Sequence, residues 1–265
     1  MDARMLDEIL WKHLLSLPYF RGMLRAVEHS FYAEMNLERP ILDMGAGDGH
    51  FASVVFAEPV EVGLDPWRKP IEEARQRGVY QLLTQANGDR IPFTDASFET
   101  VISNSVLEHI AEIDPVLQDI GRVMEPGGVF VFCVPNQRFL RDLWGQGILD
   151  RVGLHRLATH YNRFFNRVAR HEHLDVPEVW IKRLENAGFE VEKYWHYFPV
   201  RAMHMLERGH LFGLPNLLWK KTTGRWVLIQ KRWNPFIPWR KVRKYMNAGA
   251  CEDGTCTFYI ARRAA

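Results

Sequence analysis

One acid and three glycines alternate in the segment Asp43-x-Gly45-x-Gly47-x-Gly49. The apolar residues before the acid predict a buried strand, and the glycines predict the turn that leaves it. Glycine suits a backbone that must turn tightly or let a ligand approach with no Cβ in the way. The apolar residues after the turn predict a packed helix. A strand, a glycine turn and a helix in this order are typical of the first unit of a nucleotide-binding α/β domain.

A second acid, Asp65, ends the next predicted strand, 22 residues after Asp43. In nucleotide-binding α/β folds an acid about 20 residues further on accepts hydrogen bonds from the ribose hydroxyls. A carboxylate suits this role because it offers acceptors to two adjacent hydroxyls. The alternative is that Asp65 caps the helix predicted over residues 68–77, because it lies just before that helix and Pro66 follows it directly. We favour the ribose contact, which does not exclude some capping.

Polar residues also follow the third and fourth predicted strands. Asn87, Gly88 and Asp89 come after the third strand, and Asn104 and His109 come after the fourth. Histidine has a pKa near neutrality, so His109 is able to take a proton from a hydroxyl. The alternative is a structural histidine that bonds a neighbouring carbonyl.

From residue 38 to residue 136 the motifs follow one another in an order and at gaps that resemble the class I S-adenosylmethionine-dependent methyltransferases. Within that class the chain is similar to the small-molecule type, methyltransferase domain type 11. The glycine turn resembles the first motif of the class, whereas the last place of the dinucleotide form Gly-x-Gly-x-x-Gly/Ala falls on His50. The turn Pro126-Gly127-Gly128 before the apolar run 129–134 also matches the class.

The resemblance implies S-adenosylmethionine as the cofactor and assigns residues to it. Asn87 takes the place that reads the adenine amino group, where the class usually has Asp. An amide carbonyl still accepts a hydrogen bond, and Asp89 is the alternative reader if the register is shifted. The turn after the fourth strand lies against the methionine end, where His109 faces the acceptor as the catalytic candidate. The implied cofactor-binding residues are Asp43, Gly45, Ala46, Gly47, Asp65, Pro66, Asn87, Gly88 and Asn104.

The alternation of strands and helices predicts an α/β fold, and with the resemblance a Rossmann-like, doubly wound, seven-stranded mixed sheet whose last strand is antiparallel to its neighbours. Insertions follow the fifth and sixth strands. The expected organisation is a helical N-terminal cap (1–37), the cofactor-binding core (38–136), a substrate-covering insertion (137–174), a helix and the sixth strand (175–198), a basic Trp-rich insertion (199–252) and the last strand (253–265).

The insertion 199–252 stands out by its charge. The segment from Arg208 to Cys251, with Arg208 included, holds ten Lys or Arg and no Asp or Glu, so the rest of the chain carries 24 basic and 32 acidic residues. The segment also holds Trp219, Trp226, Trp233 and Trp239. We rank three interpretations of this segment. The first is a substrate lid or a surface that rests on an anionic membrane, the second is a basic face over packed tryptophans, and the third is a nucleic-acid groove. Nucleic acid is disfavoured because the acidic remainder repels a polyanion.

Histidines gather in the segment 137–174, including His171 and His173. We expect a polar lid and no metal, since positions i and i+2 do not share a helix face and no cysteine pattern completes a tetrahedral set. The three cysteines are too few for a disulfide framework, so we expect free thiols in a reducing setting. No protein partner is identifiable from the sequence.

The 265 residues are 47% hydrophobic and 25% charged, as in ordinary globular proteins. The N-terminus lacks the apolar core of a secretory signal, and no apolar run is long enough to span a bilayer. We therefore expect a cytoplasmic protein, with peripheral contact at the inner membrane face as an option. The expected activity is methyl transfer to a small, apolar or lipid- or glycan-linked acceptor by in-line displacement. The alternatives are a cofactor-binding protein without methyl transfer and an NAD-dependent oxidoreductase.

Overall fold

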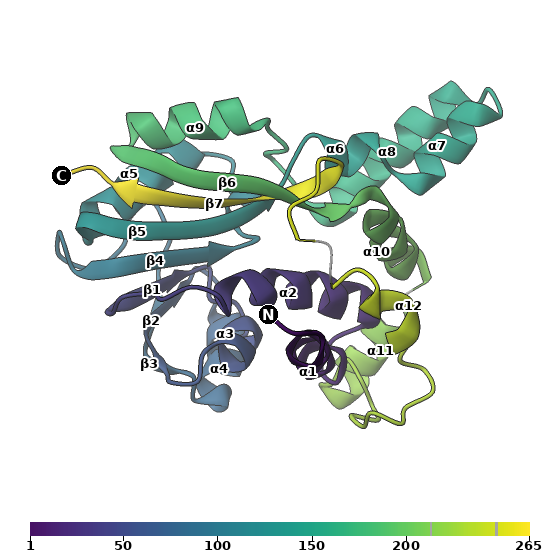
Figure 1. The fold of residues 1–265 in the computed structure, drawn as a ribbon, viewed down its shortest axis with the longest axis horizontal. Helices are drawn as coiled ribbons and strands as arrows, with labels where there is room; N and C mark the ends of the chain where they lie inside the picture. Colours follow the sequence, from purple (N-terminus) through teal and green to yellow (C-terminus); the bar gives the residue numbers. More distant parts are fainter. Residues whose placement is uncertain (213, 247–248) are drawn as a thin grey trace. The chain divides into compact units, whose positions relative to one another are not determined.

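The apolar run Ile41–Met44 forms β1, a fully buried inner strand of a seven-stranded sheet. The computed structural model describes residues 1–212, 214–246 and 249–265. The strand order is β3-β2-β1-β4-β5-β7-β6 (Figure 1). The other strands are β2 (Val60–Asp65), β3 (Tyr80–Gln85), β4 (Phe98–Asn104), β5 (Met124–Pro135), β6 (Phe189–Pro199) and β7 (Gly254–Arg263).

The pairing of the strands is mixed, as the sequence predicts. β1 pairs in parallel with β2 and β4, β2 with β3, and β4 with β5. β7 runs antiparallel to β5, with Val131 opposite Ile260. Both the doubly wound strand order and the antiparallel last strand are therefore confirmed. Because β1 and β4 are neighbours while β2 lies on the other side of β1, the strand order reverses next to the glycine turn, where α/β folds bind ligands.

The start of β5 differs from the sequence prediction, which begins the strand at residue 129. β5 begins at Met124, which pairs with Phe98, and the register then shifts so that Val129 pairs with Thr100. The Pro-Gly-Gly segment forms a bulge in the strand, and Gly127 takes a φ of 82° there. A bulge lets a strand resume its pairing after extra residues. The Pro-Gly-Gly motif therefore marks an irregularity inside β5 and not a turn before it.

Helices separate most of the strands, and runs of consecutive helices follow β5 and β6. The first two, predicted as an N-terminal helical cap, are α1 (Ala3–Leu14) and α2 (Tyr19–Tyr32), separated near Pro18. A short 3₁₀ turn, η1 (Leu107–His109), follows β4. The remaining helices are α3 (His50–Val55), α4 (Arg68–Arg77), α5 (Ile113–Val123), α6 (Arg138–Arg141), α7 (Trp144–Arg151), α8 (His155–Ala169), α9 (Pro177–Asn186), α10 (Val200–Phe212), α11 (Leu214–Thr223) and α12 (Trp239–Arg243).

The chain divides into two units. One consists of residues 1–35, 139–165 and 196–255, and the other of residues 36–138, 166–195 and 256–265. The second unit contains the glycine turn and the residues that the resemblance assigns to the cofactor. Its core joins α5 and α9 to the sheet in one buried apolar cluster, in which Phe132 stacks on Tyr259 at 4.7 Å between ring centroids.

The first unit has its own interior. The carboxylate of Glu28 is buried in α2, where it pairs with Arg25 at 2.6 Å and accepts a hydrogen bond from the Tyr197 hydroxyl at 3.0 Å. Glu207 is also buried, and its carboxylate accepts bonds from the backbone N–H groups of Trp144 and Gly145 at the start of α7. Among the described residues no helix is both long enough and apolar enough to cross a membrane.

Candidate functional site

The glycine turn after β1 has a backbone that disfavours other residues. Gly45, Gly47 and Gly49 take φ values of 85°, 56° and 71°, in the left-handed region. The N–H groups of Gly45 and Ala46 donate to the carbonyl of Leu64 at 2.8 and 2.9 Å. The turn is thus held against the carboxyl end of β2, and its conformation depends on glycine.

Gly45 and Gly47 meet different surroundings. A Cβ on Gly45 would lie 2.5 Å from a methyl of Val106, so this position is closed by the turn that follows β4. A Cβ on Gly47 would have no non-neighbouring atom closer than the Gly45 carbonyl oxygen at 4.0 Å. Gly45 therefore serves packing, while Gly47 leaves space into which a ligand could fit against bare backbone.

Asp65 ends β2 beside this space. Its Oδ2 accepts a 3.0 Å hydrogen bond from the N–H of Gly47, and its Oδ1 accepts a 2.9 Å bond from the N–H of Trp67. Burial raises the pKa of the carboxyl above its ordinary value, and the two hydrogen bonds oppose this. Trp67 is the N-cap residue of α4, so Asp65 is not the N-cap itself, but its bond to the N–H of Trp67 holds the start of the helix. The carbonyl of the predicted site residue Pro66 accepts from the side chain of Gln85.

Asp43, at the start of the motif, points to a different partner. It is buried, and its Oδ2 accepts a 2.6 Å hydrogen bond from the Tyr80 hydroxyl. Burial is the largest cause that raises its pKa to about 6, with the charge of Asp65 adding to it and Tyr80 opposing it. A Cβ on Gly63 would lie 2.8 Å from the Tyr80 ring, so this glycine makes room for the tyrosine. The sequence pattern carries no sign of the role of Tyr80.

The segment after β3 meets the same edge of the sheet. Ala86 donates its N–H to the carbonyl of Asp65 at 3.3 Å, and this places Asn87 and Gly88 directly after that contact. A Cβ on Gly88 would lie 3.0 Å from a methyl of Val116, so the backbone passes close to α5. Asn87 itself is exposed.

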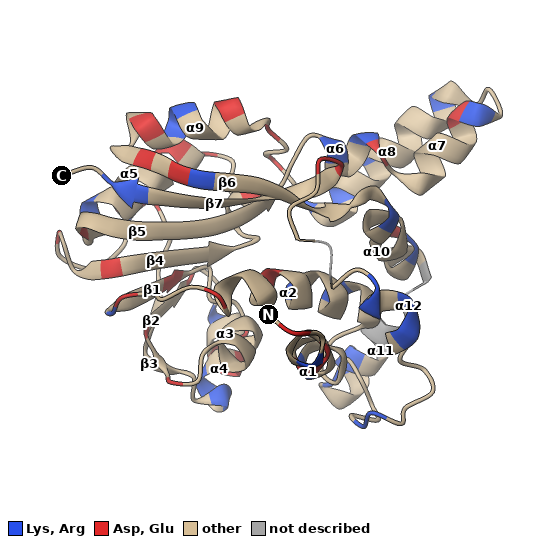
Figure 2. Cartoon of the chain, viewed as in Figure 1, with Lys and Arg blue, Asp and Glu red and all other residues tan. Residues whose placement is uncertain are grey.

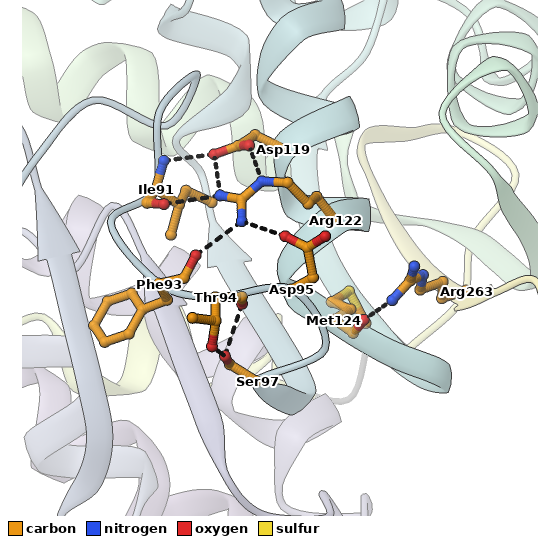
Figure 3. A network of polar contacts seen from close by, with 9 residues as sticks. All are labelled: Ile91, Phe93, Thr94, Asp95, Ser97, Asp119, Arg122, Met124 and Arg263. Carbon is orange, nitrogen blue, oxygen red and sulfur yellow. Dashed lines mark hydrogen bonds and ion pairs between the residues drawn. The ribbon is translucent and has the colours of Figure 1, made fainter.

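A single arginine holds the loop that follows. Arg122, near the end of α5, donates to the carbonyls of Ile91 and Phe93 at 2.9 and 2.8 Å (Figure 3). It also forms ion pairs with Asp119 at 2.6 Å and Asp95 at 2.9 Å. These acids raise the pKa of the guanidinium above its ordinary value. Because Arg donates through a planar fork, one side chain fixes the path of the loop.

The turn after β4 lies against the glycine turn that follows β1. Asn104 accepts a hydrogen bond from the thiol of Cys133 at 3.1 Å, and Ser105 takes a left-handed φ of 55°. Val106 then packs against Gly45. The structure thus brings together the predicted residues of the glycine turn, Asp65, the start of the loop after β3, and the turn at Asn104. None of Cys133, Cys251 and Cys256 forms a disulfide.

His109 ends η1 and is oriented by a carbonyl. Its Nδ1 lies 2.9 Å from the carbonyl oxygen of Arg170, and its ring stacks on that of His171 at 5.4 Å between centroids. Its side chain is 42% exposed, and its Nε2 lies 3.8 Å from the buried carboxylate of Glu108. The contact with a neighbouring carbonyl that a structural role of His109 requires is therefore present. It uses Nδ1, whereas Nε2 lies on the side of Glu108. The sequence reasoning missed Glu108, whose only signal is its position next to His109.

His171 and His173 separate, as expected for positions i and i+2. His173 bonds the carbonyl of Ile110 through Nε2 at 3.0 Å and pairs with Asp175 through Nδ1 at 3.3 Å. His171 instead contacts His109. The next helix, α9, begins at Pro177 with Val176 as N-cap and no side-chain cap. Pro is favoured at the first helical position, and this sets the start of α9.

The chain is similar to known methyltransferases. A family model described as a methyltransferase domain matches residues 42–132. The chain is 29% identical over 174 residues to a probable S-adenosylmethionine-dependent methyltransferase of Mycolicibacterium smegmatis, covering 65% of this chain and 60% of the relative. It is 26% identical over 219 residues to the sterol 24-C-methyltransferase erg6 of Aspergillus fumigatus, covering 72% and 58%. The chain spans about half the length of the curated relatives it matches.

A solved structure shares the fold. The crystal structure of an S-adenosylmethionine-dependent methyltransferase from Thermotoga maritima, described as a possible histamine N-methyltransferase, matches with a TM-score of 0.57 at 14% identity. The match covers 92% of this chain and 91% of that chain. At this identity the likeness shows the fold alone.

Proposed function

Since this chain belongs to the class I S-adenosylmethionine-dependent methyltransferases, with its methyltransferase domain over residues 42–132, we propose that it transfers a methyl group from that donor to a small acceptor. The observation that supports this most is the pairing of Asp65 with the N–H of Gly47 beside the space above that glycine. A buried carboxylate held by backbone donors keeps a fixed orientation, and its remaining lone pairs suit two ribose hydroxyls.

The residues present fit the cofactor in the following roles. The ligand would lie against the backbone of Ala46 and Gly47, because Gly47 has no Cβ at that point. Asp65 would accept from the ribose, and Asn87 with Gly88 would border the adenine. Asn104 would lie toward the methionine end of the cofactor. It precedes the turn in which Val106 packs against Gly45.

When bound, S-adenosylmethionine supplies a methyl group activated by a sulfonium, which an acceptor oxygen, nitrogen or carbon displaces in line. The main contribution of the protein is then to align the two partners and to exclude water. His109 is the candidate for a general base where the acceptor must lose a proton. Its Nδ1 contact with the Arg170 carbonyl would keep the lone pair of the neutral ring on Nε2.

Ligand-dependent thermal unfolding tests this proposal against its two alternatives. A ligand that binds only the folded state raises Tm, so S-adenosylhomocysteine should stabilise the protein and NAD should not. Stabilisation by NAD alone would favour an oxidoreductase. Incubation of a cell extract with labelled methyl donor, followed by mass spectrometry of products, then separates a methyltransferase from a protein that binds the cofactor without transfer.

For the acceptor, we propose an apolar or lipid-like molecule taken at a membrane surface. One relative is named a sterol 24-C-methyltransferase, which supports an apolar acceptor. The basic insertion supports the membrane contact through two exposed aromatic side chains, Trp233 at 71% and Phe236 at 84% exposure. Figure 2 shows Lys and Arg along α12 and the loop before it. Aromatic side chains favour the membrane interface, and Lys and Arg favour anionic headgroups.

Part of the basic insertion serves packing instead. Trp239 stacks on Trp11 at 5.8 Å between ring centroids. Arg243 pairs with Asp7 at 2.5 Å, and Arg232 pairs with Glu8. Two of the ten basic residues are thus compensated by acids of α1, which the sequence order does not reveal. Positions 213 and 247–248 of the predicted insertion lie outside the described residues.

Co-sedimentation with liposomes tests the membrane contact. We expect the protein to sediment with vesicles that contain anionic lipid, and the double substitution W233S/F236S to reduce this binding at least several-fold. Trp67, equally exposed at 71% but outside the basic insertion, provides the control W67S, which should bind as well as the unaltered protein. Equal absence of binding to anionic and neutral vesicles would count against the membrane surface and leave the methyl transfer untouched.

A further inference from the structure

Glu108, His109 and His171 lie together beside the turn that follows β4, and we propose that they bind one divalent transition-metal ion. Each residue offers one ligand atom, and these atoms all lie within 4.8 Å of one another. Among these atoms, Oε1 of Glu108 and Nε2 of His109 lie 3.8 Å apart. Small side-chain rotations would bring such a set around an ion at the ordinary ligand distance of about 2.0–2.2 Å.

The backbone builds this arrangement from two distant segments. The carbonyl of Glu108 accepts hydrogen bonds from the N–H groups of Glu172 and His173 at 2.8 and 3.2 Å. This fixes the segment with His171 alongside η1. Arg170, just before it, takes a left-handed φ of 58°, which is uncommon for a residue other than glycine. Such a backbone is sparsely populated and tends to occur where surrounding contacts hold it at functional sites.

His109 has the orientation typical of a metal-ligating histidine. Its Nδ1 lies 2.9 Å from the Arg170 carbonyl oxygen, so in the neutral ring the proton on Nδ1 is donated there and Nε2 carries the lone pair. Metal-bound histidines usually donate their other ring N–H to a carbonyl or carboxylate in this way. The segment is also held from α8, where the Asn166 amide donates to the His171 carbonyl at 3.3 Å.

The ligand types select the class of metal. Two imidazoles with one carboxylate suit Zn²⁺, Co²⁺, Mn²⁺ or Fe²⁺, whereas Mg²⁺ and Ca²⁺ prefer oxygen ligands throughout. The Glu108 side chain is only 3% exposed, and a bound cation compensates the cost of a buried carboxylate. Three protein ligands leave at least one coordination position open, as in catalytic zinc sites.

The metal also decides between two roles of His109. An ion that takes the Nε2 lone pair prevents that atom from acting as a general base. The open position could then bind and polarise an oxygen of the acceptor, which suits an acceptor with a hydroxyl or carboxylate. A chain without the ion would leave Nε2 to the acceptor directly.

The test is metal binding by the full chain after removal of any histidine tag and treatment with a chelator. We expect the protein to take up one equivalent of Co²⁺, followed by its visible absorption, and one equivalent of Zn²⁺, followed by calorimetry. H171Q and E108Q should each weaken binding about tenfold or more, since even residues that only support a ligand cost 10–100-fold. H160Q is the matched control because His160 is an exposed histidine of α8, and it should bind as the unaltered protein.

Two results would overturn the site: no saturable uptake of Co²⁺ or Zn²⁺ by the folded protein, or uptake that survives both H171Q and E108Q. Because Glu108 is buried, circular dichroism must show that E108Q folds. If E108Q does not fold, H171Q alone decides the test, because His171 is partly exposed. Stabilisation by S-adenosylhomocysteine on the same preparation reports the cofactor pocket independently, so loss of the metal site and failure of the proposed function are distinguishable.

Discussion

The carboxylate of Asp65 accepts a 3.0 Å hydrogen bond from the backbone N–H of Gly47. The bond joins the end of β2 to the middle of the glycine turn after β1, two points 18 residues apart in the chain. Because the same carboxylate also holds the N–H of Trp67, one side chain ties together both segments that would border a bound ribose. The predictions below start from this bond and move outward from it.

Substitution D65A should weaken the binding of S-adenosylhomocysteine by about tenfold or more. Hydrogen bonds to a charged group contribute about 1.5–3 kcal/mol, and the variant loses both the ribose acceptor and the support of the turn. Titration calorimetry measures the affinity. The control is E61A in the same strand, because the Glu61 carboxylate also accepts from a backbone N–H, that of Ile41, but at the opposite end of β2. Equal affinities for D65A and E61A would contradict the role of Asp65.

Substitution G47A should cost both stability and cofactor affinity. A left-handed backbone costs an alanine about 1–2 kcal/mol, and its Cβ would enter the space above the turn. G127A is the control, since Gly127 also has a positive φ, of 82°, with nothing within 4 Å of its Cβ. Both variants should lower Tm by similar amounts in thermal unfolding. Only G47A should lose stabilisation by S-adenosylhomocysteine, and a similar loss in G127A would speak against a ligand at Gly47.

Substitution D43N should change how stability depends on pH. Burial raises the pKa of Asp43 from 3.8 to about 6, so between these values the folded state holds a proton that the unfolded state has released. Stability attributable to this group is therefore present below pH 4 and declines as pH rises toward 6, by about 3 kcal/mol at most. D43N keeps an oxygen that accepts from Tyr80 and lacks this decline.

Denaturant unfolding at pH 4, 5, 6 and 7 compares the two proteins. The free energy of unfolding of D43N should rise relative to the unaltered protein as pH increases across the window. Parallel curves would show that Asp43 keeps an ordinary pKa despite its burial.

Substitution R122Q should loosen the loop that follows Asn87 and Gly88. It removes the donors to the Ile91 and Phe93 carbonyls together with two ion pairs, so we expect a loss of about 1–3 kcal/mol in stability. S-adenosylhomocysteine should also bind several-fold more weakly, through the adenine side.

Chemical unfolding and calorimetry measure both effects. R68Q is the control, because Arg68 forms a single exposed ion pair with Glu72 within α4. Such pairs contribute little, so R68Q should match the unaltered protein in both assays. An R122Q variant with normal affinity would show that the loop is positioned without Arg122.

Local patterns in the sequence were enough to predict the sheet, the glycine turn and the position of Asp65. Apolar periodicity reports burial of a strand, and glycine reports a backbone that only glycine adopts at low cost. Both signals depend on neighbours in the chain. The bulge at the start of β5 escaped them, because a Pro-Gly-Gly segment reads the same in a turn before a strand and in a bulge inside one.

Only the tertiary structure decided which side chains meet. Tyr80 reaches Asp43 from 37 residues away, and Arg122 reaches back about 30 residues to the loop before β4. His171 meets His109 because backbone bonds lay its segment beside η1. These contacts depend on strand order and on the path of loops, which sequence spacing does not encode. The glycine turn and the strand that ends at Asp65 were thus predictable from local sequence, whereas the electrostatics around them and the histidine cluster arose from long-range packing.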